Sequence, residues 1–144
     1  MPLLLNDSIF KNGFCWGQYE PKIDDESRLH LPKEVVDILE GNGITKLWRC
    51  PDPTGERFVL CPSQHRLIFI KMIKDSFKDS EEVEEVYRLL CSGTEAAIDS
   101  QGRIRIQKVC LDHVKVNAGK RVNVLGVGRW YEVTPWEFGS AEKR

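Results

Sequence analysis

Two arginines stand four residues after an aspartate in matching stretches of this chain. Arg28 follows Asp24 and Arg103 follows Asp99, with three polar residues inside each pair. An arginine guanidinium carries its donors in a rigid fork, so it can meet a guanine edge or a phosphate at two points. The same spacing allows an ion pair that only holds the shape of a turn. The residues alone leave both interpretations open, and a carboxylate that orients a base-reading arginine would satisfy both.

An internal repeat gives the two Asp-x-x-x-Arg motifs the same context. Segments 20–37 and 95–112 are offset by 75 positions and agree at six of eighteen residues, where chance gives about one. The identical pairs are Glu20/Glu95, Ile23/Ile98, Asp24/Asp99, Arg28/Arg103, Lys33/Lys108 and Asp37/Asp112. A duplication is the simplest explanation.

Each repeat predicts the same run of elements. An extended segment leads to the aspartate, a polar turn follows, and a short strand of alternating polar and apolar residues begins at the arginine. Gly102 can take a positive φ in the second turn. Pro32 is expected at the first position of a helix. Helices are expected at 32–40 and 108–115, and later strands at 45–49, 58–61, 121–125 and 130–134.

The stretch between the repeats predicts two helices. Ser63 is expected to cap a helix that runs to about Phe77, and Ser80 a second one that runs to about Leu90. The predicted organisation is a first repeat at 16–63, a helical connector at 64–91 and a second repeat at 92–135.

Composition limits how the chain could bind a polyanion. The net charge is −1, from 21 basic and 22 acidic residues. Composition therefore does not indicate nucleic acid, and any DNA contact must come from a local basic face. We expect several chains to bind side by side, because linked weak contacts gain through effective concentration. Four aromatic residues are candidates for the subunit contact or for core packing: Phe14, Trp16, Trp130 and Trp136.

The residues do not predict an enzyme. The five cysteines have no metal-ligand spacing and are expected to be reduced and mostly buried. Cys61 and His65 lie four residues apart, but no acid is evident to orient the histidine. Gly126-Val127-Gly128 is too short for a phosphate loop and fits a hairpin turn. We expect no catalytic residues, no metal and no cofactor.

Targeting signals are weak in this sequence. The apolar run Met1–Leu5 ends at Asn6 and Asp7, whereas a signal peptide needs a basic start and a longer apolar stretch. No run has the length of a membrane span. We expect a cytoplasmic protein with no membrane partner.

Over about residues 15–138 the sequence resembles the MraZ family of the SpoVT–AbrB superfamily. The supporting segments are Gly17–Glu20, Asp24–Pro32, Cys91–Gly93, Asp99–Ile104 and Leu125–Gly128. The resemblance implies an α+β, β-rich fold in which two tandem swapped-hairpin AbrB-like halves form one barrel, with helices outside. It also implies a ring-like homo-oligomer.

The function that the resemblance implies is DNA-binding transcriptional regulation, without enzyme activity. The partner would be double-stranded operator DNA with repeated short boxes upstream of division and cell-wall genes, and the protein would be nucleoid-associated. Arg28 and Arg103 would face the DNA, oriented by Asp24 and Asp99. Second-tier candidates for phosphate contacts are His30, Arg105, Lys33 and Lys108.

Two departures from the family pattern bear on that function. Gln107 replaces the usual proline, and Asp24-Asp25-Glu26 places three acidic residues beside Arg28, which weakens the attraction of the first turn for phosphate. A second hypothesis therefore stands beside the first: a ring-forming protein-interaction module without sequence-specific DNA binding.

Overall fold

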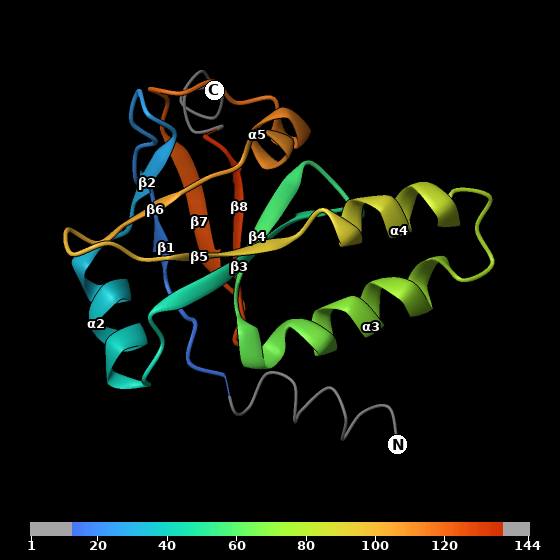
Figure 1. The fold of residues 1–144 in the computed structure, drawn as a ribbon, viewed down its shortest axis with the longest axis horizontal. Helices are drawn as coiled ribbons and strands as arrows, with labels where there is room; N and C mark the ends of the chain where they lie inside the picture. Colours follow the sequence, from blue (N-terminus) through green and yellow to red (C-terminus); the bar gives the residue numbers. More distant parts are fainter. Residues whose placement is uncertain (1–12, 137–144) are drawn as a thin grey trace, which may run out of the picture.

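The computed structural model describes residues 13–136, which form a six-stranded antiparallel sheet, a separate two-stranded ribbon and helices on both faces of the sheet (Figure 1). The order of strands in the sheet is β1 (Gln18–Tyr19), β7 (Val122–Gly126), β8 (Tyr131–Pro135), β4 (Arg57–Pro62), β3 (Lys46–Asp52) and β5 (Thr94–Ala97). The β2–β6 ribbon consists of β2 (Arg28–His30) and β6 (Arg103–Arg105).

The helices lie on two sides of the sheet. They are α2 (Lys33–Gly41), the short 3-10 helix η1 (Ser63–His65), α3 (Arg66–Phe77), α4 (Val83–Cys91) and α5 (Lys108–Val114). Helices α3 and α4 form a hairpin that extends away from the body of the molecule, on the side opposite α2 and the β2–β6 ribbon (Figure 1).

The two repeats exchange their first strands. Strand β1 of the first repeat pairs with β7 of the second, and β5 of the second pairs with β3 of the first. The loops before the turns repeat this exchange: the N–H of Ile23 donates to the carbonyl of Lys120, and that of Ile98 to the carbonyl of Thr45, both at 2.9 Å. Neither repeat can complete the sheet without the other.

The α+β, strand-rich class is confirmed, whereas the predicted barrel is not. Strands β1 and β5 are the two edges of the sheet, and no pairing among the described residues joins them. The ribbon forms a separate sheet and does not close the first one.

Alternating side chains of the central strands fill two cores. Leu47, Phe58 and Leu60 point to the face that α2, α5 and the ribbon cover. Trp48 and Val59 point to the other face, where they pack with residues of α3 and α4. Both faces of β3 and β4 are therefore buried, as expected for central strands covered on two sides.

Most predicted elements lie within a few residues of their expected places, but the caps differ. Pro32 is the residue before α2 and not its first residue. Ser63 does not cap α3, because a 3-10 turn comes first, and its hydroxyl is buried without a partner among the described residues. Ser80 accepts a hydrogen bond from the N–H of Glu82 at 3.0 Å, which fixes the turn before α4.

The apolar run Met1–Leu5, on which the expectation about targeting rests, lies outside the described residues. Among residues 13–136, no helix is long and apolar enough to span a membrane.

Candidate nucleic-acid interface

The β2–β6 ribbon brings four predicted site residues onto one face. Arg28 lies opposite Arg105, and His30 lies opposite Arg103. The third pair, Leu29 and Ile104, is fully buried on the other face of the ribbon. Because alternate residues of a strand point to opposite faces, burial of this apolar pair turns the four basic side chains outward.

The two turns are built in the same way. In each, one oxygen of the aspartate accepts the backbone N–H groups two and four residues later, and the other accepts the arginine Nε–H. The side-chain bond measures 2.9 Å for Asp24–Arg28 and 2.8 Å for Asp99–Arg103. Each aspartate thus contacts the arginine of its own motif.

These hydrogen bonds favour the charged form of both carboxyl groups. At Asp99, the backbone N–H of Arg103 is the main cause of a lowered pKa, and it outweighs the opposing effect of burial. At Asp24, burial acts to raise the pKa, but the hydrogen bonds from His30, Arg28 and Glu26 together hold it far below its usual value. Each arginine therefore sits on a carboxylate that stays ionised at neutral pH.

The repeat extends to the backbone bonds that flank the ribbon. The N–H of Leu31 donates to the carbonyl of Gly102 at 2.9 Å, and the N–H of Ile106 donates to that of Ser27 at 2.7 Å. These positions correspond across the repeat, so an approximate two-fold axis relates Arg28 to Arg103.

The two turns differ in what else they hold. Nε2 of His30 donates to Asp24 at 2.9 Å. The Asp24 carboxylate therefore accepts hydrogen bonds from two side chains, those of Arg28 and His30. Arg105, which corresponds to His30 in the second repeat, instead reaches across to the first turn and donates to the carbonyl of Glu26 at 2.9 Å. Nη2 of Arg28 lies 3.6 Å from the Glu26 carboxylate, whereas the Nη atoms of Arg103 contact no acceptor among the described residues. The guanidinium of the second turn thus has fewer protein partners, although the side chains of Arg28 and Arg103 are similarly exposed, at 24% and 21%.

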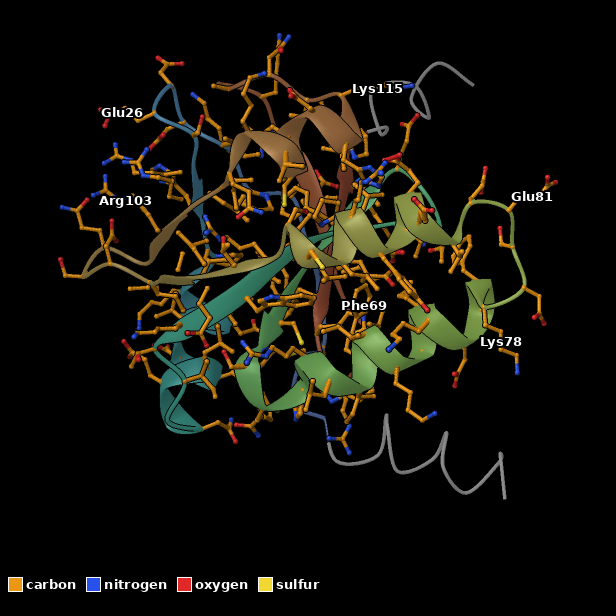
Figure 2. All side chains as sticks on the ribbon, turned by 45° about the vertical axis from the view of Figure 1, so that its right-hand side comes forward. Glu26, Phe69, Lys78, Glu81, Arg103 and Lys115 are labelled. Atoms are coloured by element: carbon orange, nitrogen blue, oxygen red, sulfur yellow. The ribbon has the colours of Figure 1, made fainter. Side chains whose placement is uncertain are left out.

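Figure 2 places Glu26 and Arg103 at the end of the molecule away from the α3–α4 hairpin, which carries Lys78 and Glu81. Arg103 and the first turn therefore lie at the opposite end of the molecule from the tip of the α3–α4 hairpin.

Lys33 and Lys108 do not lie on the ribbon. They are the first residues of α2 and α5, and their side chains are highly exposed. Each pairs with the aspartate one helical turn later, at 3.1 Å for Asp37 and 2.9 Å for Asp112. These pairs explain two further identities of the repeat as local ion pairs, and they partly neutralise both lysines.

Sequence reasoning missed two residues that hold the ribbon in place. Arg49 of β3 is buried and donates to the carbonyl of Arg105 at 2.6 Å and to Thr94 Oγ1 at 2.6 Å. Gln107, which corresponds to Pro32 of the first repeat, accepts from the hydroxyl of Thr94 at 2.7 Å and donates to the carbonyl of Ser92 at 2.9 Å. A polar residue within a buried strand was the only available signal for Arg49.

The cysteines do not form a reactive centre. Four of the five are buried and all are free thiols, with Cys91 exposed. Burial raises the pKa of Cys15 and of Cys110 to about 12, and it raises that of Cys61 as well. Nδ1 of His65 donates to the carbonyl of Arg129 at 2.8 Å, and His65 is not paired with Cys61. A thiol that stays protonated is a poor nucleophile.

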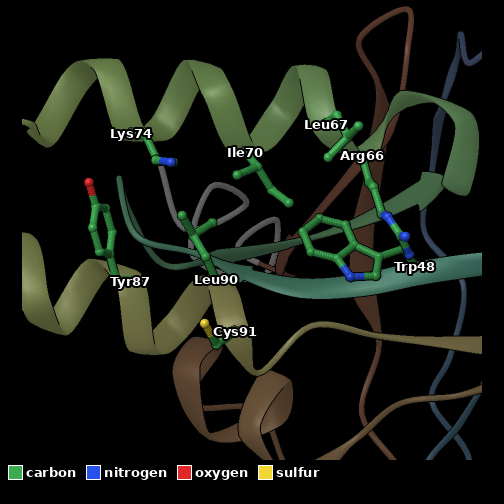
Figure 3. A pocket seen from close by; sticks show the side chains of 8 residues that line it. All are labelled: Trp48, Arg66, Leu67, Ile70, Lys74, Tyr87, Leu90 and Cys91. Carbon is green, nitrogen blue, oxygen red and sulfur yellow. The ribbon is translucent and has the colours of Figure 1, made fainter.

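A cavity of about 470 Å³ lies between α3 and α4, far from the ribbon (Figure 3). Trp48, Leu67, Ile70 and Leu90 give it an apolar lining, and Lys74 and Tyr87 stand near its outer end. The lining holds one thiol, that of Cys91, and no carboxylate or histidine.

Within the described part of the chain, no group of three or more histidine, cysteine or acidic residues gathers in a way that could hold a metal ion. Comparison of the whole chain with models of protein families and with curated protein sequences gave no match.

Proposed function

We propose that this protein is a DNA-binding transcriptional regulator that resembles the MraZ family and has no enzyme activity. The observation that carries the proposal is the β2–β6 ribbon, in which Arg28, His30, Arg103 and Arg105 share one outward face over a buried apolar pair. Two arginines held by carboxylates on a rigid support match what direct readout of guanine needs.

The shape of the ribbon suits the major groove of DNA. That groove admits a two-stranded β-ribbon, and several regulators read bases with strands. In the proposed complex Arg28 and Arg103 contact base edges, and His30 and Arg105 contact phosphates beside them. The approximate two-fold axis presents equivalent arginines from the two repeats to neighbouring base steps.

We further propose that the chain assembles into a ring-like homo-oligomer on nucleoid DNA in the cytoplasm. A head-to-tail ring needs two different matching surfaces on each chain. One is the cavity between α3 and α4, where Leu67 is 71% exposed. The other is the apolar patch of Trp16 and Leu125 at the β1–β7 edge, where both side chains are exposed.

Charge favours a second copy as the occupant of the cavity. Arg66 and Lys74 line the cavity and form no ion pair among residues 13–136. At the Trp16–Leu125 patch, Tyr19 donates to the Glu34 carboxylate at 2.8 Å and lies 3.5 Å from the carbonyl of Trp16. Trp130 is excluded from this contact because it is buried in the core behind α3. Each ring contact would thus bring a carboxylate to two cations that lack an ion pair within the described residues, although Nζ of Lys74 lies 5.7 Å from the ring centre of Tyr87.

A gel-shift series tests the function. The probe is duplex DNA from the region upstream of the protein's own gene, with a scrambled duplex of equal length as the control. We expect a shift that favours the upstream duplex and weakens steeply as salt rises, because bound cationic side chains release counterions. Equal affinity for both duplexes, or no shift, would contradict the proposal.

The alternative function is a ring-forming protein-interaction module without sequence-specific DNA binding. The engagement of both arginines by carboxylates and the net charge of −1 favour it. Such a module would form the assembly but leave the mobility of both duplexes unchanged, which separates the two functions in one experiment.

A further inference from the structure

A cluster of cations from both repeats lies against the first turn. Lys22 and Arg121 face each other in an antiparallel bridge. The N–H of Gly119 donates to the carbonyl of Ile23 at 2.7 Å, and the N–H of Ile23 donates to the carbonyl of Lys120 at 2.9 Å. The loop of the second repeat thus carries Lys120 and Arg121 to the residues that immediately precede Asp24.

The contact with the acidic part of this turn is close. A Cβ added at Gly119 would lie 3.0 Å from Oδ1 of Asp25. Gly119 also has a φ of +87°, a left-handed backbone that favours glycine. The carboxylates that weaken the first turn are therefore bordered by cations that are distant in the sequence.

The cluster borders a hollow of about 240 Å³. Lys120, Arg121 and Trp136 line it together with Lys115. The Arg121 guanidinium lies 5.8 Å from the ring centre of Trp136 and donates to the carbonyl of Glu20 at 2.7 Å. Lys115 pairs with Glu56 at 3.2 Å, whereas Lys22 and Lys120 have no ion pair among the described residues. Two exposed ammonium groups are thus available beside a fixed guanidinium.

The second turn has no such cluster. The positions that correspond to Lys22, Lys120 and Arg121 hold Ala97, Thr45 and Lys46, which pair in the same way. Arg121 corresponds to another cation, Lys46, whereas Lys22 and Lys120 have no charged counterpart, so two added lysines accompany only the turn with three acidic residues. Cations at this place would restore the attraction for a polyanion that the three acidic residues of the first turn oppose.

We propose that Lys22, Lys120 and Arg121 form a second phosphate-binding site beside the first turn, which extends the DNA contact of the ribbon. The inference rests on the proposed function and deepens it. The lysines contact the phosphate backbone, while Arg121, held by Glu20 and Trp136, orients the loop. Such contacts are independent of base sequence.

The test is the double variant Lys22→Gln/Lys120→Gln, compared with Lys71→Gln/Lys78→Gln, in and directly after α3, which changes the net charge equally. Affinity is measured as a function of salt for the upstream and the scrambled duplex. The cluster variant should lose roughly tenfold in affinity for both duplexes at physiological salt, and each lost phosphate contact should lower the slope of log affinity against log salt by about 0.9. The α3 variant and the charge-preserving variant Lys22→Arg/Lys120→Arg should bind like the parent.

Two results would overturn the inference while leaving the proposed function intact. One is a cluster variant with the parent's affinity and salt slope, in a preparation where Arg103→Ala loses binding. The other is an equal loss in the α3 variant, which would assign the effect to net charge alone. A parent protein that binds neither duplex would instead overturn both the function and the site.

Discussion

Ser27 and Gly102 occupy the same position in the two turns and share a left-handed backbone, with φ of 63° and 77°. Each is the last of the three residues between the aspartate and the arginine of its motif, and its N–H donates to the backbone carbonyl of that aspartate. A left-handed conformation costs a residue with a Cβ roughly 1–2 kcal/mol, which glycine avoids. The first turn therefore carries backbone strain that the second turn does not.

This difference predicts opposite effects of two substitutions. Ser27→Gly should leave the free energy of unfolding unchanged or raise it by up to about 1 kcal/mol, since relief of strain exceeds the added flexibility of the unfolded chain. Gly102→Ala should lower it by about 1–2 kcal/mol, and its Cβ would lie 3.1 Å from Val36 Cγ2. Urea denaturation measures both. A destabilised Ser27→Gly would show that the turn does not need the left-handed region.

Acid should destabilise the turns through their two aspartates. Folding lowers the pKa of Asp24 and of Asp99 below the usual 3.8. Protons then bind more readily to the unfolded chain, so this stabilisation is complete above the usual pKa and is lost as pH falls toward the folded pKa. The double variant Asp24→Asn/Asp99→Asn should be less stable at neutral pH and should lose less stability than the parent below about pH 4. Parallel curves of unfolding free energy against pH would contradict this.

The buried Arg49 should be more important for stability than its exposed counterparts. It donates to the carbonyls of Thr94 and Arg105, which join β5 and β6 to β3. Arg49→Met leaves these acceptors without a charged donor and should lower the free energy of unfolding by about 1–3 kcal/mol. Arg88→Met is the matched control, because Arg88 makes only exposed ion pairs on α4, which are worth about 0–1 kcal/mol. Equal effects of the two substitutions would remove the role assigned to Arg49.

The turns could be predicted from the sequence because their bonds are local. Asp99 reaches only two and four residues ahead, so the motif itself contains every partner that shapes the turn. The internal repeat indicated that Arg28 and Arg103 occupy equivalent positions. The alternation of polar and apolar residues in the short strand indicated which side chains point outward. Lys33 and Lys108 were proposed on charge alone, and the structure gives each a carboxylate one helical turn away.

The pairing between distant segments could not be predicted in this way. Alternation shows that a strand has a buried face but does not name its partner, so the exchange of β1 and β5 left no local signal. For the same reason, the sequence did not predict that Lys120 lies beside the first turn or that Arg105 donates a hydrogen bond to Glu26. His113 is a further case: Nε2 lies 2.8 Å from the carbonyls of Asp52 and Gly55, which fixes α5 on the β3–β4 turn.

Assembly should depend on the cavity between α3 and α4. Light scattering at micromolar concentration should detect a species of about six or more chains. The reason is that each chain makes only weak DNA contacts, which must be linked in one assembly to give a useful affinity. Leu67→Glu places a charge on the exposed apolar rim and should reduce the species to smaller forms, and Trp16→Glu should do the same from the other surface. Glu84→Lys on the outer side of α4 is the control and should leave the mass unchanged. A parent chain that is a clean monomer would contradict the ring.

The last prediction is an asymmetry between the two arginines of the ribbon. The Nη groups of Arg103 have no protein partner among the described residues, whereas Nη2 of Arg28 lies 3.6 Å from Glu26. Loss of an arginine that grips guanine costs about 1–3 kcal/mol per contact and relaxes specificity at that base. Because the loss recurs in every subunit, Arg103→Ala should abolish detectable binding to the upstream duplex while the assembly stays intact.

Arg28→Ala should weaken binding by less, and the cations around the first turn give the reason. If Lys22 and Lys120 hold phosphates there, removal of Arg28 leaves that attraction in place and affects mainly the discrimination between the upstream and scrambled duplexes. Gel shifts with both duplexes, with the mass of each variant checked by light scattering, separate these effects. Parent-like binding by Arg103→Ala would refute its assignment as a base contact. Binding lost only together with the assembly would instead identify the Asp99–Arg103 pair as a structural support of the ribbon.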